Sequence, residues 1–161
     1  MSVKVEVFTD PNPLRNKVTY GDGGIDADVI AKAEAMVAAM QSDYLNWVAD
    51  DLDKLTQCYS EASQLPADQR GPAMDLLFGV AHDIKGQGGS FGYDLMTIIA
   101  NQLCRFIESS PDFGDLAMDV VAVHVEALRL VITDRLEGEG GPHGRKLLDG
   151  LDAVIRKAVR G

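Results

Sequence analysis

Apolar residues recur every three or four positions from residue 26 almost to the end of this chain, and this periodicity most constrains its fold. Such spacing places side chains on one face of an α-helix, whereas a half-buried strand alternates with period two. Ile30, Val37 and Tyr44 begin the pattern, and Leu151 and Ile155 end it. No segment after residue 26 alternates for long enough to require a sheet. The sequence therefore predicts an all-α fold.

Proline and glycine divide the periodic sequence into separate helices. Breaks are expected at 65–72, 109–111 and 138–142, where turn-forming residues cluster. The expected helices are 26–61 (one long helix or two in succession), 72–90, 95–106, 116–136 and 147–155. Because short loops favour antiparallel neighbours, we expect an antiparallel four-helix bundle with additional N- and C-terminal helical segments.

The first 25 residues are different in character. Pro11, Pro13 and the run Gly21-Asp-Gly-Gly24 interrupt any periodicity, although Val3-Lys-Val-Glu-Val7 alternates like a short strand. We therefore expect residues 1–25 to form an N-terminal extension, irregular or with a short strand, and residues 26–161 to form the helical domain.

Composition narrows the classes of partner. The 161 residues include 15 Lys and Arg against 25 Asp and Glu, a formal net charge of −10 that disfavours nucleic acid and anionic lipid. No apolar run reaches the length of a membrane span, so we expect a cytoplasmic protein. We also expect it to be a monomer. Cys58 and Cys104 lie far apart without a CxxC spacing, which indicates reduced thiols and no metal site.

The expected helix 72–90 contains an unusual number of glycines. Gly79, Gly86, Gly88 and Gly89 each cost about 1 kcal/mol relative to alanine in a helix interior. Their sum is a large part of a net domain stability of about 5–15 kcal/mol. The glycines therefore serve either close packing of helices or an accessible helix face.

A helical projection favours the accessible face. At about 100° per residue, Gly79, Gly86 and Gly89 all lie within about 60° of His82. Lys85 follows one turn later on the same stripe, where its ammonium could neutralise a phosphoryl oxygen held on the imidazole. The opposite side carries the apolar residues Ala73, Leu77, Val80, Ile84 and Phe91. His82 is thus expected to point outward, in a setting suited to phosphoryl acceptance.

The segment Ala81-His-Asp-Ile-Lys-Gly-Gln-Gly-Gly-Ser-Phe-Gly92 resembles the signature of histidine-containing phosphotransfer (HPt) domains. That signature is His-x-x-Lys-Gly followed by a small residue and then apolar-Gly, and a looser resemblance of helices covers about residues 40 to 136. It implies that Nε2 of His82 accepts a phosphoryl group from a receiver aspartate and passes it to another receiver. Lys85 would steady the phosphoryl oxygens, and Gly86 and Gly89 would keep His82 accessible.

The resemblance also implies partners and cofactors. The partners would be response-regulator receiver domains, a hybrid histidine kinase, or both, and the Mg²⁺ of the chemistry would belong to the receiver. No cofactor is expected on this chain. Because the sequence has no phosphate-binding nucleotide motif, we expect a phosphotransfer intermediate rather than an autonomous kinase.

Two further residues are candidates for the site. Phe78 lies on the His82 stripe, where it either belongs to a receiver-docking patch or packs in the core. Gln102 interrupts the apolar stripe of the next helix, so its amide needs a buried partner. That partner is either the second ring nitrogen of His82 or a backbone carbonyl of the core. Some members of the family place a glutamine twenty-two residues after the histidine, where this chain has Cys104.

Two other functions compete with a phosphorelay. Gly88-Gly-Ser-Phe-Gly92 matches G-x-S-x-G, which would make Ser90 a hydrolase nucleophile with Asp134 and His143, but that motif requires a preceding strand. Alternatively, the protein docks a receiver and inhibits it without relaying the phosphoryl group.

Two other groups of residues are interpreted as structural. His124 is surrounded by apolar residues, and Asp50-Asp-Leu-Asp53 is interpreted as the solvated face of a helix.

Overall fold

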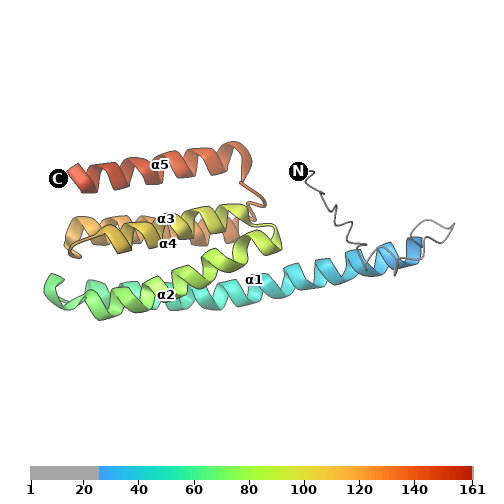
Figure 1. Cartoon of the computed structure of the whole chain (residues 1–161), viewed down its shortest axis with the longest axis horizontal. Coiled ribbons are helices and arrows are strands. Elements are labelled where there is room, and N and C mark those ends of the chain that lie inside the picture. The colour runs from blue at the N-terminus through green and yellow to red at the C-terminus, as the bar shows by residue number, and fades with distance from the viewer. Residues whose placement is uncertain (1–25, 161) are drawn as a thin grey trace, which may run out of the picture. The chain divides into compact units, whose positions relative to one another are not determined.

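The computed structural model describes residues 26–160, so the predicted extension 1–25 lies outside the described residues. Five α-helices account for most of this range (Figure 1): α1 (Ala27–Ser63), α2 (Gly71–Gly88), α3 (Asp94–Ser109), α4 (Asp115–Thr133) and α5 (Gly141–Arg160). Short 3-10 turns, Ala67–Gln69 and Gly89–Phe91, precede and follow α2. Residues 26–160 contain no strand, so the all-α prediction is confirmed.

The helix boundaries follow the proline and glycine signals closely. The first helix is one continuous helix, and Pro72 lies in the first turn of α2. Gly92 has φ +81° after the 3-10 turn, which is the left-handed conformation that glycine adopts at helix ends. Only the last helix differs clearly, because α5 begins at Gly141 rather than near Leu147.

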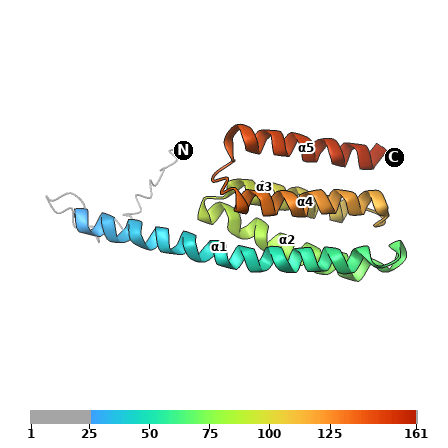
Figure 2. The same cartoon turned by 180° about the vertical axis from the view of Figure 1, so that it is seen from behind.

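Between Met36 and Val37 the chain divides into two compact units, and the apolar core lies within the second. Helices α2 and α3 pack against each other, α4 packs on α3, and α5 packs on α4, an order that both views show (Figures 1 and 2). The largest fully buried apolar side chains are Tyr44, Leu52, Leu55, Met74, Leu77, Ile84, Leu95, Met96, Ile99, Leu103 and Leu128.

Aromatic side chains join α1 to the turn after α2. The rings of Tyr44 and Phe91 stack with centroids 4.6 Å apart, and Tyr93 lies 5.6 Å from Tyr44. Trp47 meets Phe91 edge-on at 6.2 Å. This cluster fixes the C-terminal end of α2, the helix that carries His82, against α1.

Two arginines connect separate parts of the chain through hydrogen bonds. Arg70 is buried and donates hydrogen bonds to the carbonyl oxygens of Leu65, at 2.9 Å, and Phe113, at 2.7 Å. Arg129 of α4 donates to the hydroxyl of Thr56 on α1 at 2.8 Å. Arg70 therefore satisfies two carbonyl oxygens in loops, and Arg129 ties α4 to α1.

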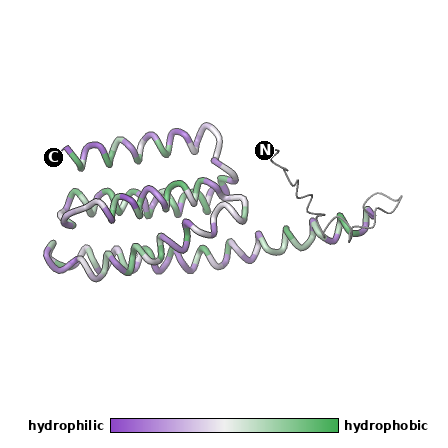
Figure 3. Tube along the Cα trace, viewed as in Figure 1, coloured by the Kyte–Doolittle hydropathy of each residue, from purple (hydrophilic) through white to green (hydrophobic). Residues whose placement is uncertain are grey.

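None of the helices in the described part of the chain is long and apolar enough to cross a membrane. Apolar and polar residues instead alternate around each helix (Figure 3). This pattern is typical of helices that bury one face and leave the other in water.

Candidate functional site

His82 lies near the middle of α2 with its side chain exposed. The opposite face of α2 is buried in the core through Ala73, Leu77, Ala81 and Ile84. Within residues 26–160, neither ring nitrogen of His82 forms a hydrogen bond, and the nearest aromatic neighbour is Phe78. The sequence prediction that His82 faces outward agrees with this arrangement.

Phe78 lies beside His82 and also reaches the core. Its ring centroid lies 6.1 Å from that of His82, and the two rings are tilted by 33°. The side chain is half-buried and packs against the core. Phe78 therefore supports one side of the imidazole while presenting part of its ring at the surface.

The glycines of α2 fall into two groups. A Cβ atom added at Gly79 or Gly86 would meet no atom within 4 Å, so both positions leave open space beside His82. At Gly88 the added atom would lie 2.8 Å from the carbonyl oxygen of Tyr93 and 2.9 Å from Cβ of Met96. Gly79 and Gly86 thus clear the histidine stripe, whereas Gly88 allows α2 and α3 to approach closely.

Gly89 has an intermediate position. It belongs to the 3-10 turn rather than to α2, and its N–H donates to the Thr97 hydroxyl at 2.9 Å. A Cβ atom here would lie 3.3 Å from a carboxylate oxygen of Asp94. Gly89 is therefore part of the junction between α2 and α3 as well as of the predicted stripe.

Lys85 lies one turn after His82 and is half-buried. Its charge lowers the pKa of the Cys104 thiol on α3, although burial raises that pKa by more. The ammonium therefore lies near enough to α3 to act on the thiol electrostatically. Lys85 therefore places a cation one helical turn after His82, on the side of α2 that adjoins α3.

Gln102 forms hydrogen bonds with side chains of α4 and α5, so neither partner considered for it, His82 or a backbone carbonyl, is found within residues 26–160. Its carbonyl oxygen lies 3.3 Å from Nε2 of His124, and its amide nitrogen donates to a carboxylate oxygen of Asp152 on α5. His124 is fully buried, and its Nδ1 lies 2.7 Å from the carbonyl oxygen of Val120. Gln102 thus links α3, α4 and α5. The physical reason is that its stripe faces α4 and α5 as well as α2.

The structural interpretation of His124 is consistent with these contacts. Burial lowers its pKa, while the hydrogen bond to Val120 and the charge of Asp152 oppose that effect. Its ring nitrogens are both within reach of polar groups, as expected for a buried histidine.

Side chains of α1 lie near the helix that carries His82, including Asp50 and Asp51, which were expected only on a solvated helix face. Lys54 forms an ion pair with Asp51 at 3.0 Å, and this contact raises the pKa of Lys54. The charge of Asp83, the neighbour of His82, adds a smaller increase. A groove of about 460 Å³ continues beside α1 and is lined by Trp47, Asp50, Asp51, Lys54, Gln87 and Phe91. Only contacts between helices could have shown that this part of α1 lies beside α2.

Thr97 was also missed, although its chemistry is visible in the sequence. It is a hydroxyl residue within the apolar run of α3, and its side chain donates to the Lys85 carbonyl oxygen at 3.0 Å. Together with the bond from Gly89, this contact closes the end of α2 onto α3. A polar residue within an apolar stripe was the available signal.

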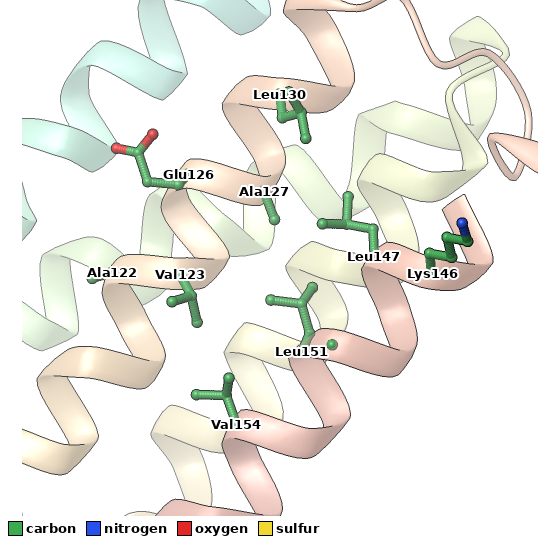
Figure 4. Close-up of a pocket in the computed structure, with 10 residues that line it drawn as sticks. Ala122, Val123, Glu126, Ala127, Leu130, Lys146, Leu147, Leu151 and Val154 are labelled. Carbon is green, nitrogen blue, oxygen red and sulfur yellow. The ribbon is translucent and has the colours of Figure 1, made fainter. Parts of the chain in front are cut away.

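A second groove, of about 560 Å³, lies between α4 and α5 (Figure 4). Aliphatic side chains such as Leu130, Leu147 and Val154 line it, and no predicted site residue belongs to it. The described residues contain no cluster of three or more His, Cys, Asp or Glu side chains arranged to hold a metal ion.

The serine-hydrolase alternative has no structural support. Ser90 lies in a 3-10 turn that follows a helix, and no strand occurs among residues 26–160 to provide the required strand-to-helix turn. Within the same range, no hydrogen bond joins Ser90 to Asp134 or His143, and all three side chains are exposed.

Comparisons of the chain with models of protein families, with curated proteins and with solved structures found no match.

Proposed function

We propose that this protein is a histidine phosphotransfer protein in which His82 accepts a phosphoryl group from a receiver aspartate and passes it to another receiver. The observation that supports this best is the open surface around His82. The exposed imidazole is flanked by Gly79 and Gly86, which have no side chains and open space around them. This space would let the backbone of a partner approach.

The chemistry needs little from the helices beyond position and charge. The lone pair of Nε2 in neutral His82 would attack the phosphorus of an aspartyl phosphate, forming an N–P bond as the P–O bond to aspartate breaks. The aspartate leaves as a carboxylate, and the imidazole proton stays on Nδ1. Lys85 would stabilise charge on the transferring oxygens, and Mg²⁺ would be held by the receiver.

We extend the proposal to the architecture. The four antiparallel helices of an HPt bundle would be α2, α3, α4 and the part of α1 after Val37, with α5 as an added C-terminal helix. The core contributed by α1 begins at Tyr44, within this part of the chain. Because the proposed partners are cytoplasmic signalling proteins, the protein would act in the cytoplasm.

A two-step transfer experiment tests the relay. A panel of receiver domains is charged with acetyl phosphate, each is mixed with the protein, and the labelled protein is then separated and offered to a second receiver. Transfer in both steps supports a relay. Binding that lowers receiver phosphorylation without label on the protein supports the inhibitory module instead. Ser90→Ala is the control and should transfer normally.

A further inference from the structure

Few buried side chains hold α5 on the bundle, and a polar connection adds to them. Gly144 and Leu151 are the buried residues of α5, which packs on α4 and α3. Gln102 of α3 donates its amide hydrogen to Asp152 of α5, while its carbonyl oxygen faces Nε2 of His124 on α4. Because His124 is fully buried and Asp152 is exposed, Gln102 connects a titratable group of the interior with a charge at the surface.

The contact of Nδ1 determines where neutral His124 carries its proton. Nδ1 lies 2.7 Å from the carbonyl oxygen of Val120, which can only accept a hydrogen bond, so Nδ1 must be the donor. A neutral imidazole has one N–H, and its Nε2 is then an acceptor. Nε2 nevertheless faces the carbonyl oxygen of Gln102 at 3.3 Å, and two acceptors cannot form a hydrogen bond with each other.

A half-turn of the Gln102 amide does not remove this conflict. Its NH₂ group would then donate to Nε2 of His124, but its carbonyl oxygen would face the carboxylate of Asp152, which only accepts when it is ionised. With neutral His124 and ionised Asp152, Gln102 therefore satisfies one neighbour at a time. One added proton on Nε2 satisfies all three side chains with Gln102 in its observed orientation.

We propose that His124, Gln102 and Asp152 form a proton-dependent link between the interior of the bundle and α5. When His124 takes a proton from solvent, its Nε2–H donates to Gln102, and the amide is fixed in the orientation that holds Asp152. When the proton leaves, this orientation loses the support of His124, and the tie to α5 weakens. The link does not depend on the function proposed for His82.

Charges reach this link from both of the helices that pack on α4. Asp152 of α5 and Arg105 of α3 are the charged residues that line the groove beside Gln102, which has a volume of about 370 Å³. Burial is the largest effect on His124 and lowers its pKa, whereas the hydrogen bond to Val120 and the charge of Asp152 raise it. Neutralising Asp152 should therefore lower this pKa further. If Gln102 transmits the effect, the change must depend on its amide.

NMR titration of the histidine rings tests the link, and the chain has three histidines to assign. Nitrogen shifts should place the proton of neutral His124 on Nδ1. Asp152→Asn should weaken proton binding at His124 by about threefold to tenfold, because the new amide can donate to Gln102 once Gln102 turns toward neutral His124. Asp149→Asn, at another exposed aspartate of α5, is the control and should change nothing. Unchanged proton binding in Asp152→Asn, or a neutral His124 protonated on Nε2, would overturn the proposal.

A direct effect of the Asp152 charge on His124 is the competing explanation, and Gln102→Met separates the two. In the Gln102→Met background, Asp152→Asn should leave proton binding at His124 nearly unchanged. An equal effect of Asp152→Asn in both backgrounds would overturn the role of Gln102.

Unfolding measurements give a second readout that does not require His124 to titrate before the protein unfolds in acid. Asp152→Asn should lose more stability than the wild type between pH 7.5 and pH 5.5, because a lower folded-state pKa of His124 increases its difference from the unfolded chain. The carboxyl group of an exposed aspartate titrates below this range. An equal loss of stability in the two proteins would contradict the link.

Discussion

The hydroxyl of Thr97 donates a hydrogen bond to the backbone carbonyl oxygen of Lys85 at 3.0 Å. The same hydroxyl oxygen accepts the N–H of Gly89 at 2.9 Å, so one side chain of α3 holds both sides of the last turn of α2. This turn follows His82 directly. Thr97 therefore positions the end of the candidate site without touching the imidazole.

Replacing Thr97 with valine should lower the free energy of unfolding by about 1–2 kcal/mol, because a backbone donor and a backbone acceptor lose their partner. Thr97→Ser retains the hydroxyl and should recover most of that loss. Urea unfolding of the three proteins measures the effect. Equal stability of Thr97→Val and the wild type would show that the two hydrogen bonds of the Thr97 hydroxyl do not stabilise the fold.

Alanine substitutions at two nearby glycines should change the free energy of unfolding in opposite directions. Gly86→Ala should raise the free energy of unfolding by about 0.5–1 kcal/mol, since the added methyl group meets only open space and improves helix propensity. Gly88→Ala should lower it by about 1–3 kcal/mol, because Cβ would be forced against Tyr93 and Met96. Denaturant unfolding measures both, and destabilisation by Gly86→Ala would contradict the open surface beside His82.

The buried His124 should make stability depend on pH. Burial lowers its pKa in the folded state, so the folded protein binds the proton less readily than the unfolded chain. Stability should therefore fall as pH drops below the unfolded pKa of about 6.5, by up to about 1.4 kcal/mol per pH unit. Above that pH both states are neutral and the contribution is constant.

Unfolding at pH 7.5 and pH 5.5 measures this dependence. His124→Gln should reduce the difference between the two conditions, whereas His143→Gln, which changes an exposed histidine, should leave it unchanged. An undiminished loss of stability at pH 5.5 in His124→Gln would assign the effect to other groups.

Arg70 should stabilise the fold through carbonyl groups rather than through its ion pair. Arg70→Met leaves the carbonyl oxygens of Leu65 and Phe113 without this donor and should cost about 2–3 kcal/mol. Asp115→Asn removes only a carboxylate that is 96% exposed and should cost less than about 1 kcal/mol. Thermal or urea unfolding compares the two variants. Equal losses of stability in both would contradict the claim that Arg70 stabilises the fold mainly through the carbonyl groups.

The helices were predictable from sequence because periodicity and turn residues are local signals. The helical projection also placed His82 correctly, since an apolar face defines its opposite. It could not distinguish Gly86 from Gly88, because that difference depends on where α3 approaches α2. The contacts of Gln102 depend in the same way on α4 and α5, which carry His124 and Asp152. Periodicity likewise cannot tell whether an apolar stripe is covered, as Met36 and Met40 demonstrate.

The most direct test of the proposed function is the transfer of radiolabelled phosphoryl groups from charged receiver domains to the wild type, His82→Gln and His143→Gln. The proposal predicts that the wild type and His143→Gln gain an acid-labile, base-stable label and that His82→Gln gains none. Label retained by His82→Gln, or no label on the wild type from any receiver tested, would contradict it.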